Sequence, residues 1–341
     1  MRLALFRLWP EPSAQSPVAP LPLASAVWST ALLAFASTCA HASSLPTRDQ
    51  SPFLAGFGLP GPMSARLPRS TWSADINWGS TALVQNGAGE FLIVDAETRE
   101  LRLTFARALA ARWAVQFELP YRETNGGSLD SFIDDWHGIF GLPEGARPIQ
   151  PEDRLRLHYW RDGETLIELG TPIEGFADAS ASLVYSVHHS DQSAVSAALS
   201  VKVPTGKNHW LNSSGAVDVS AIIAAEHRLN DCWSIAGQAA ASVLGNGDLL
   251  PHLQRELVWS GRAGVSFQLT PALDVILQMD AHSSAFDSEL DFFSESVVAT
   301  LGANVEFGPS WTLSFGLSED ITVEHSPDVV FVIGLKKSAA E

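Results

Sequence analysis

Residues 257–281 read LVWSGRAGVSFQL, then Thr270-Pro271-Ala272, then LDVILQMDA, and this stretch decides the fold. Both runs place large apolar residues at every second position and smaller or polar residues between them. Successive side chains of a β-strand point to opposite faces. The stretch therefore predicts two antiparallel strands, joined by a tight turn, each with one apolar and one polar face. On the second strand, Leu277 lies on the apolar face and Gln278 on the polar face, so an added charge should be tolerated better at 278 than at 277.

The same alternation recurs along most of the chain. Many of the runs are about ten residues long, which is the length that a tilted strand needs to cross a bilayer. The strands expected from this pattern number fourteen: 72–84, 98–108, 112–122, 153–160, 165–170, 177–188, 194–203, 216–228, 232–243, 255–269, 272–283, 295–307, 310–318 and 328–336.

Short and long connections take turns between these strands. Membrane-spanning barrels of the outer-membrane type have tight turns at one end and long loops at the other. We therefore expect residues 71–337 to form an all-β, antiparallel transmembrane β-barrel of fourteen strands. The count falls to twelve if 153–160 and 165–170 form a hairpin within a loop. The short connections are 110–111, 230–231, 270–271 and 308–309, and the long ones are 85–97, 123–152, 204–215, 245–254, 285–293 and 319–327.

Four tryptophans occupy similar places at the start of predicted strands. Each lies on the apolar face, and three of them directly follow a short connection. Tryptophan is enriched where a membrane protein meets the bilayer interface. We expect an aromatic girdle there; tryptophans in the core of a soluble barrel are the alternative. The girdle residues are Trp72, Trp113, Trp233 and Trp311.

The charge balance argues against a nucleic-acid partner. The chain has 21 Lys and Arg against 38 Asp and Glu, a formal net charge of −17, whereas binding to phosphates relies on basic groups. Charged residues make up only 17% of the chain. This composition suggests a membrane context. For an outer-membrane barrel we expect membrane lipid, the machinery that assembles outer-membrane proteins, and small-molecule solutes as partners.

The N-terminus resembles a targeting segment in composition. Arg2 and Arg7 precede an apolar run at 27–35, and Ala40-His41-Ala42 fits the small-x-small cleavage pattern. We expect residues 1–42 to be a secretory signal cleaved near Ala42, leaving a protein of the Gram-negative outer membrane. A membrane anchor helix is the alternative for this segment, and lipidation of Cys39 is a weaker one.

Residues 43–70 are rich in proline, and we expect them to lie in the periplasm or in the lumen of the barrel. Strand number alone does not decide whether that lumen is open, since about eight strands are filled by side chains and sixteen leave a channel. Small residues on the polar faces favour open space. They are Ser73, Gly79, Ser196, Ala236, Ala240, Gly264, Gly302 and Ser314.

The long connection 123–152 contains an expected helix at 128–140. Its apolar residues recur at helical spacing, and Ser128 could cap it. Acidic residues in a first turn interact favourably with the helix dipole, so a metal site is the weaker interpretation. We expect this external helix to cover or narrow the barrel mouth. The candidate mouth or constriction residues are Asp130, Phe132, Asp134, Asp135, Trp136 and His137.

This region also carries a resemblance to a known family. Residues 126–143 read GGSLDSFIDDWHGIFGLP, with RDQSP at 48–52, GFAD at 175–178 and KVPTG at 202–206. In these motifs the chain resembles a family of uncharacterised exported proteins, the domain-of-unknown-function family 3187, over most of residues 45–337. The resemblance implies an outer-membrane location and no particular activity.

A channel or uptake pore for small molecules is the function that we expect, with a structural or assembly-related barrel of filled lumen as the alternative. A surface enzyme is the third hypothesis. Residues 122–125 resemble the segment that carries the Asn of outer-membrane phospholipases, but Ala111 and Trp113 stand where the nucleophile and base would be needed. The sequence contains no complete catalytic set and no cofactor motif, and the acidic residues of 128–140 are better explained without a metal, so we expect no enzyme activity, no cofactor and no metal.

Overall fold

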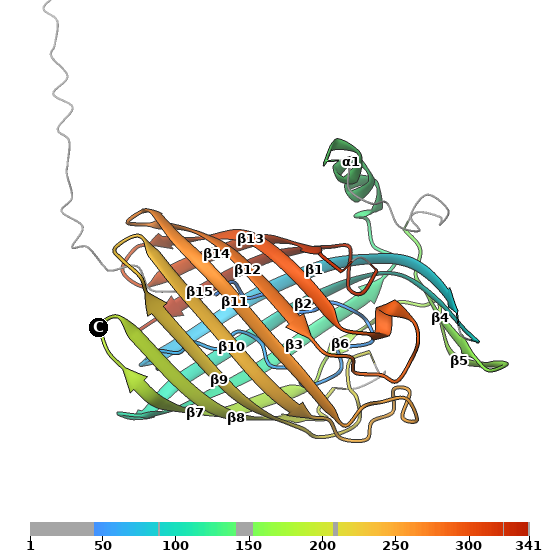
Figure 1. The fold of residues 1–341 in the computed structure, drawn as a ribbon, viewed down its shortest axis with the longest axis horizontal. Helices are drawn as coiled ribbons and strands as arrows, with labels where there is room; N and C mark the ends of the chain where they lie inside the picture. The colour runs from blue at the N-terminus through green and yellow to red at the C-terminus, as the bar shows by residue number, and fades with distance from the viewer. Residues whose placement is uncertain (1–43, 88, 141–152, 207–210, 323, 340–341) are drawn as a thin grey trace, which may run out of the picture. The chain divides into compact units, whose positions relative to one another are not determined.

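The computed structural model describes residues 44–87, 89–140, 153–206, 211–322 and 324–339. Within them, twelve strands form the barrel wall (Figure 1). These are β1 (Ser70–Gly87), β2 (Glu90–Ala110), β3 (Trp113–Asn125), β7 (Ala179–His189), β8 (Ser193–Val203), β9 (Asp218–Arg228), β10 (Trp233–Val243), β11 (Leu257–Thr270), β12 (Leu273–His282), β13 (Ser296–Phe307), β14 (Trp311–Asp320) and β15 (Val329–Ser338).

The wall is antiparallel and closed. Each strand pairs with its neighbours in order, and β1 pairs with both β2 and β15, from Thr71 opposite Ser338 to Ser80 opposite Val329. Closure gives every barrel strand a hydrogen-bonding partner on both sides, which a sheet surrounded by lipid requires. The all-β transmembrane barrel expected from the alternation is confirmed. Among the described residues, no helix has the length and apolar character needed to cross a membrane.

Of the two strand counts expected, twelve is correct. The segments predicted at 153–160 and 165–170 form β4 (Arg156–Arg161) and β5 (Glu164–Leu169), which pair with each other as a hairpin. This hairpin extends the sheet beside the outer part of β2 and takes no place in the ring (Figure 1). A third short strand, β6 (Ile173–Phe176), pairs with β3 beyond Pro120, where the pairing of β3 with β7 has stopped.

The prediction of a long connection at 85–97 is wrong. β1 and β2 continue through it and remain paired up to Gly87 opposite Glu90. Beyond the ring, these strand ends are covered by neighbouring segments, and Leu83, Leu92 and Val94 are buried. Alternation fades where both faces of a strand are covered, so the sequence pattern failed here.

Outward and inward faces follow the predicted parity. On β12, Leu277 is 52% exposed and the adjacent Gln278 only 1%. The exposed apolar positions form the surface expected to meet lipid, and the polar positions face the lumen.

The two ends of the barrel differ. One end carries the tight turns, and the other carries the long connections together with the β4–β5 hairpin. At this long-loop end lies a compact apolar cluster, here called the loop-end core. Its members include Phe53, Leu54, Phe57, Leu83, Leu92, Val94, Leu157, Tyr159, Leu211, Leu249, Leu250, Phe286, Leu290, Phe292 and Phe293.

Candidate functional site

The lumen is the candidate site, and residues 44–69, here called the N-terminal segment, occupy it. The segment first runs toward the long-loop end along one side of the wall. The Leu45 N–H donates to Oε1 of Gln278 at 3.0 Å, and the Thr47 hydroxyl donates to Asp280 at 2.9 Å. His282, further along β12, lies 3.0 Å from the Asp49 carboxylate. The three wall residues follow one another along the inner face of β12, so the segment tracks this strand.

The segment then enters the loop-end core. The ring of Phe53 contacts Phe293 edge to face, with centroids 5.2 Å apart, and Phe57 contacts Phe286 at 5.5 Å. Phe53 is 1% exposed. The apolar closure of the long-loop end is therefore built jointly by the N-terminal segment and the long connections.

From there the segment returns along β9 and β10 toward the short-turn end. The Gly58 N–H donates to Asp218 at 2.8 Å, and the Met63 N–H donates to Gln238 at 2.8 Å. Arg66 forms an ion pair with Glu226. These contacts join backbone groups or side chains of the segment to wall side chains, so in this part the segment adds no strand to the sheet.

Small wall residues make room for the segment. A Cβ built on Gly302 would lie 2.7 Å from Cδ1 of Leu45, and one on Gly316 would lie 3.4 Å from the same atom. A Cβ on Gly334 would approach Pro46 to 2.8 Å. These glycines on β13, β14 and β15 form a hollow in the wall that receives Leu45 and Pro46. The expectation that small inward residues indicate open space is therefore corrected at Gly302.

Charged side chains form a network where the segment crosses the lumen. Glu118 lies 2.5 Å from Arg48 and 2.9 Å from Arg102. Glu100 lies 2.5 Å from both Arg102 and Arg122. All five side chains are at most 12% exposed. Buried ion pairs persist only when each charge has good partners, and here three guanidinium groups alternate with two carboxylates.

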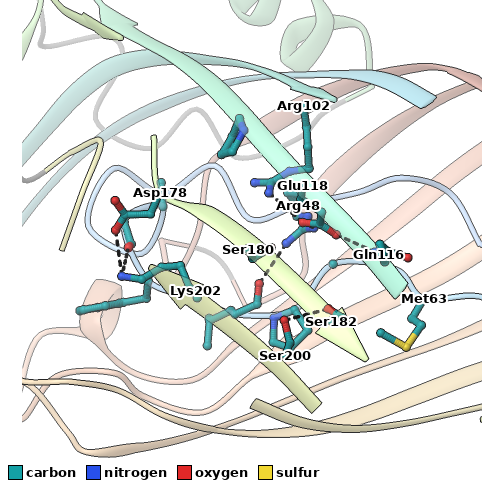
Figure 2. Close-up of a pocket in the computed structure, with 18 of the residues that line it drawn as sticks. Arg48, Met63, Arg102, Gln116, Glu118, Asp178, Ser180, Ser182, Ser200 and Lys202 are labelled. Atoms are coloured by element: carbon teal, nitrogen blue, oxygen red, sulfur yellow. Dashed lines mark hydrogen bonds and ion pairs between the residues drawn. The ribbon is translucent and has the colours of Figure 1, made fainter. Parts of the chain in front are cut away.

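A second buried cluster lies around Lys202 on β8. Its Nζ is 2.9 Å from Asp178 and 3.0 Å from Asp218, and Figure 2 shows it beside Asp178. The same ammonium group donates to the carbonyl of Gly56 at 3.3 Å. Lys202 thus links the wall to the N-terminal segment.

In the described part of the chain, cavities lie beside the segment, and two of them flank it. One, of about 40 Å³, lies toward β3, β7 and β8 (Figure 2). The other, of about 100 Å³, lies toward β11, β12 and β13 and is here called the β12 cavity. Arg48, Arg102 and Arg122 line both cavities. The segment therefore divides the remaining space of the lumen.

At the long-loop end, Tyr159 of β4 has a raised pKa. Its hydroxyl donates to Glu90 at 2.9 Å within the loop-end core. Burial, together with this hydrogen bond, raises the pKa of Tyr159 to about 12. The phenol therefore remains a hydrogen-bond donor well into the alkaline range.

The helix expected at 128–140 is present as α1 (Asp130–Phe140). Ile133 has no exposed surface and packs with Leu129 and Val329, and the ring of Phe132 lies 5.6 Å from that of Phe331. Val329 and Phe331 have the outward parity of β15, which places these contacts on the outer side of the wall. Glu97, also of outward parity, accepts hydrogen bonds from the backbone N–H groups of Ser128 and Leu129.

The candidate mouth residues are therefore not brought together at a constriction in the described residues. Phe132 is 48% exposed, Asp135 is exposed, and Asp130 accepts a hydrogen bond from the Asp153 N–H at 2.8 Å. Asp134, Trp136 and His137 lie on α1, with side chains outside the part of the chain that is described. The rest of the connection, 141–152, lies outside the described residues as well.

The four candidate girdle tryptophans lie at the short-turn end. Trp72, Trp113 and Trp233 are each 42–43% exposed, and the ring of Trp72 meets that of Trp311 edge to face at 5.2 Å. Their role at a membrane interface stays a prediction. In the described part of the chain, no three His, Cys, Asp or Glu side chains gather as metal ligands.

A family model described as "Protein of unknown function (DUF3187)" matches residues 22–338. The chain belongs to this family. No curated protein sequence matches it.

Among solved structures, the DUF3187 chain is similar to the COG4313 outer membrane channel from Pseudomonas putida F1, with 14% identity, a TM-score of 0.55, and coverage of 80% of this chain and 96% of that one. This likeness concerns the fold. Weaker similarities link it to the NanC porin, with 10% identity, a TM-score of 0.44, and coverage of 78% and 100%. The toluene transporter TbuX from Ralstonia pickettii gives 10% identity, a TM-score of 0.41, and coverage of 80% and 90%.

Proposed function

We propose that this protein is an outer-membrane channel for small solutes, closed in this structure by its own N-terminal segment. The closed barrel, the apolar outer face and the polar, charged inner face support this function. The Pseudomonas putida F1 protein with the same fold is described as an outer membrane channel, which agrees with the proposal. In this proposal residues 1–42 act as the cleaved signal; they lie outside the described residues.

The observation that carries the proposal is the way the N-terminal segment is held. Within the lumen hydrogen bonds and ion pairs join it to wall side chains, such as Arg48 to Glu118 and Met63 to Gln238, beside apolar packing of Leu45 and Met63 on the wall. The wall is complete without the segment, since β1 to β15 already close the ring. Displacing the segment would therefore open a polar path and leave the barrel intact.

A barrel with a permanently filled lumen is the second candidate. The loop-end core favours it, because Phe53, Leu54 and Phe57 are buried there among residues of the long connections. This function requires no transport. A surface enzyme remains the third hypothesis, without a complete catalytic set to support it.

Conductance in planar bilayers tests the proposal. The mature chain and a variant lacking 44–69 are refolded, and heat-modifiable gel mobility confirms that each is folded. We expect rare openings in the complete chain and steady conductance in the deletion variant. A complete chain that never opens would support the filled-barrel function, and a folded deletion variant without conductance would overturn the channel proposal.

A disulfide lock provides the matched control. A Cβ built on Gly79 of β1 lies 3.0 Å from Cβ of Gln50, so a small shift reaches the ~3.5–4.5 Å of a disulfide. The variant carries Gly79→Cys and Gln50→Cys, with Cys232→Ser to remove the exposed thiol. Openings should vanish when the pair is oxidised and return on reduction. Equal conductance in both states would show that the segment is not the gate.

A further inference from the structure

We propose that the β12 cavity is a binding site for a small organic carboxylate, which is the class of solute that the channel would pass. This inference rests on the proposed function and deepens it. The cavity lies between the N-terminal segment and the wall, so a ligand there would contact both. Its volume of about 100 Å³ is several times the ~10–15 Å³ that one water requires.

Charged groups of both signs lie around this cavity. Four guanidinium groups line it, those of Arg48, Arg102, Arg122 and Arg262. The carboxylates paired with them are Glu100, Glu118 and Asp280, and Asp49, which lies beside His282, is a fourth carboxylate. With His282 counted as neutral these formal charges balance, so the preference for an anion rests on unused hydrogen-bond donors.

Arg262 on β11 is the residue with unused donor capacity. Its side chain is 9% exposed, and its Nη2 lies 3.0 Å from Oδ1 of Asp280. Its Nη1 is buried and has no hydrogen-bond partner among the described residues. An unpaired buried donor of this kind is costly, and carboxylate oxygens are the acceptors that guanidinium binds best.

Further unpartnered polar atoms lie at the same cavity. Within the described part of the chain, Oγ of Ser296, Oε1 of Gln50 and Oδ1 of Asp280 are buried without a hydrogen-bond partner, and all three residues line the cavity. The serine hydroxyl is the donor among them. A ligand carboxylate could accept from Ser296 as well as from Arg262.

Part of the remaining lining is apolar. Leu54, Phe57 and Leu59 of the N-terminal segment and Val298 and Val330 of the wall border the cavity. A fully hydrated inorganic anion gains nothing from such a surface, whereas the hydrocarbon part of an organic acid does. The lining therefore favours a carboxylate with a short apolar part over phosphate.

Binding of propionate to the refolded complete chain tests the site without reference to conductance. Saturation-transfer NMR titrations compare propionate with its uncharged isostere propionamide, with tetramethylammonium and with inorganic phosphate. We expect binding of propionate only. Equal binding of propionamide, or preferential binding of tetramethylammonium or phosphate, would overturn the assignment.

Two variants with opposite expected effects localise the site. Arg262→Gln should weaken propionate binding at least tenfold, whereas Arg107→Gln, at an exposed position of outward parity on β2, should leave it unchanged. Asp280→Asn removes the carboxylate that competes for Arg262 and should strengthen binding severalfold, a gain that misfolding cannot produce. Unchanged affinity in both Arg262→Gln and Asp280→Asn would overturn the proposal, while the conductance experiment would still decide the channel function by itself.

Discussion

The guanidinium of Arg48, in the N-terminal segment, lies 2.5 Å from the carboxylate of Glu118 on β3. Glu118 also binds Arg102, so it holds two cations that would otherwise face each other. This carboxylate joins the content of the lumen to its wall.

Glu118→Gln should therefore destabilise the protein more than Arg48→Met. Removing one partner from a buried ion pair costs about 3–5 kcal/mol when a charge is left unpaired. Glu118→Gln leaves Arg48 without a carboxylate partner and Arg102 with Glu100 alone, whereas Arg48→Met leaves Glu118 paired with Arg102. Urea unfolding in detergent micelles would measure the difference. Equal losses would mean that the network is well hydrated and carries little energy.

Gly316→Val should prevent the N-terminal segment from settling in place. The added methyl groups would take the space of Leu45, whose Cδ1 lies 3.4 Å from a Cβ at this position. We expect faster tryptic cleavage at Arg66 or Arg69 and more frequent channel openings. Gly237→Val on β10 is the matched control, because its nearest neighbour is a wall carbonyl. Equal rates of tryptic cleavage in both variants would argue against the hollow as the binding place of the N-terminal segment.

Leu277→Arg and Gln278→Ala should separate membrane stability from gating. Leu277 faces outward, and an arginine near the bilayer midplane costs about 2–4 kcal/mol. Gln278 instead accepts from the Leu45 N–H and donates to Thr47, so Gln278→Ala should raise conductance with little loss of stability. Alternation alone predicts that position 278 tolerates an added charge. This prediction is revised, because the N-terminal segment occupies the space beside Gln278. Comparable unfolding curves for the two variants would contradict the assigned faces.

Deleting 128–143 should leave conductance unchanged, because the described contacts of α1 lie on the outer side of the wall. Ile133→Asp should detach the helix with the same lack of effect on ion flow. Increased conductance with altered ion selectivity in either variant would instead support the helix as a constriction at the mouth.

Alkaline pH should loosen the long-loop end through Tyr159. Its pKa is raised from 10 to about 12 in the folded protein, so the folded state holds the proton more tightly. The stabilisation is complete below pH 10 and is lost as the pH rises toward 12. Tyr159→Phe should remove this part of the pH dependence. The phenolate absorbance near 295 nm would follow the titration, since the chain has only three tyrosines.

The wall could be predicted from the sequence because its pattern is local. One apolar and one polar face give strict alternation, and the strands around Trp113, Trp233 and Trp311 begin within a residue or two of the expected positions. The extension of β1 and β2 was missed because Leu83, Leu92 and Val94 are covered by neighbouring segments. Whether α1 lies inside or outside the wall depends on its contacts with β15, which is nearly 200 residues further along the chain. Alternation does not encode such distant contacts.

The lumen could not be predicted in the same way. The N-terminal segment binds through backbone groups such as the N–H of Leu45, Gly58 and Met63, which every sequence possesses. In the sequence, a glycine that receives Leu45 cannot be distinguished from a glycine that lines open space. The cluster of guanidinium groups at the β12 cavity became visible only when the structure placed Arg48 beside Arg102.

The burial of Leu45 has a practical consequence for how the two ends of the chain can be handled. Leu45 has no exposed surface and is hydrogen-bonded to Gln278 inside the ring. An affinity tag joined just ahead of Leu45 would therefore begin within the barrel and compete with the N-terminal segment for space in the lumen. β15 instead ends at Ser338, at the short-turn end, where an added sequence meets no such obstacle. Tags and fluorescent fusions are therefore expected to be tolerated at the C-terminus and to disturb gating at the other end.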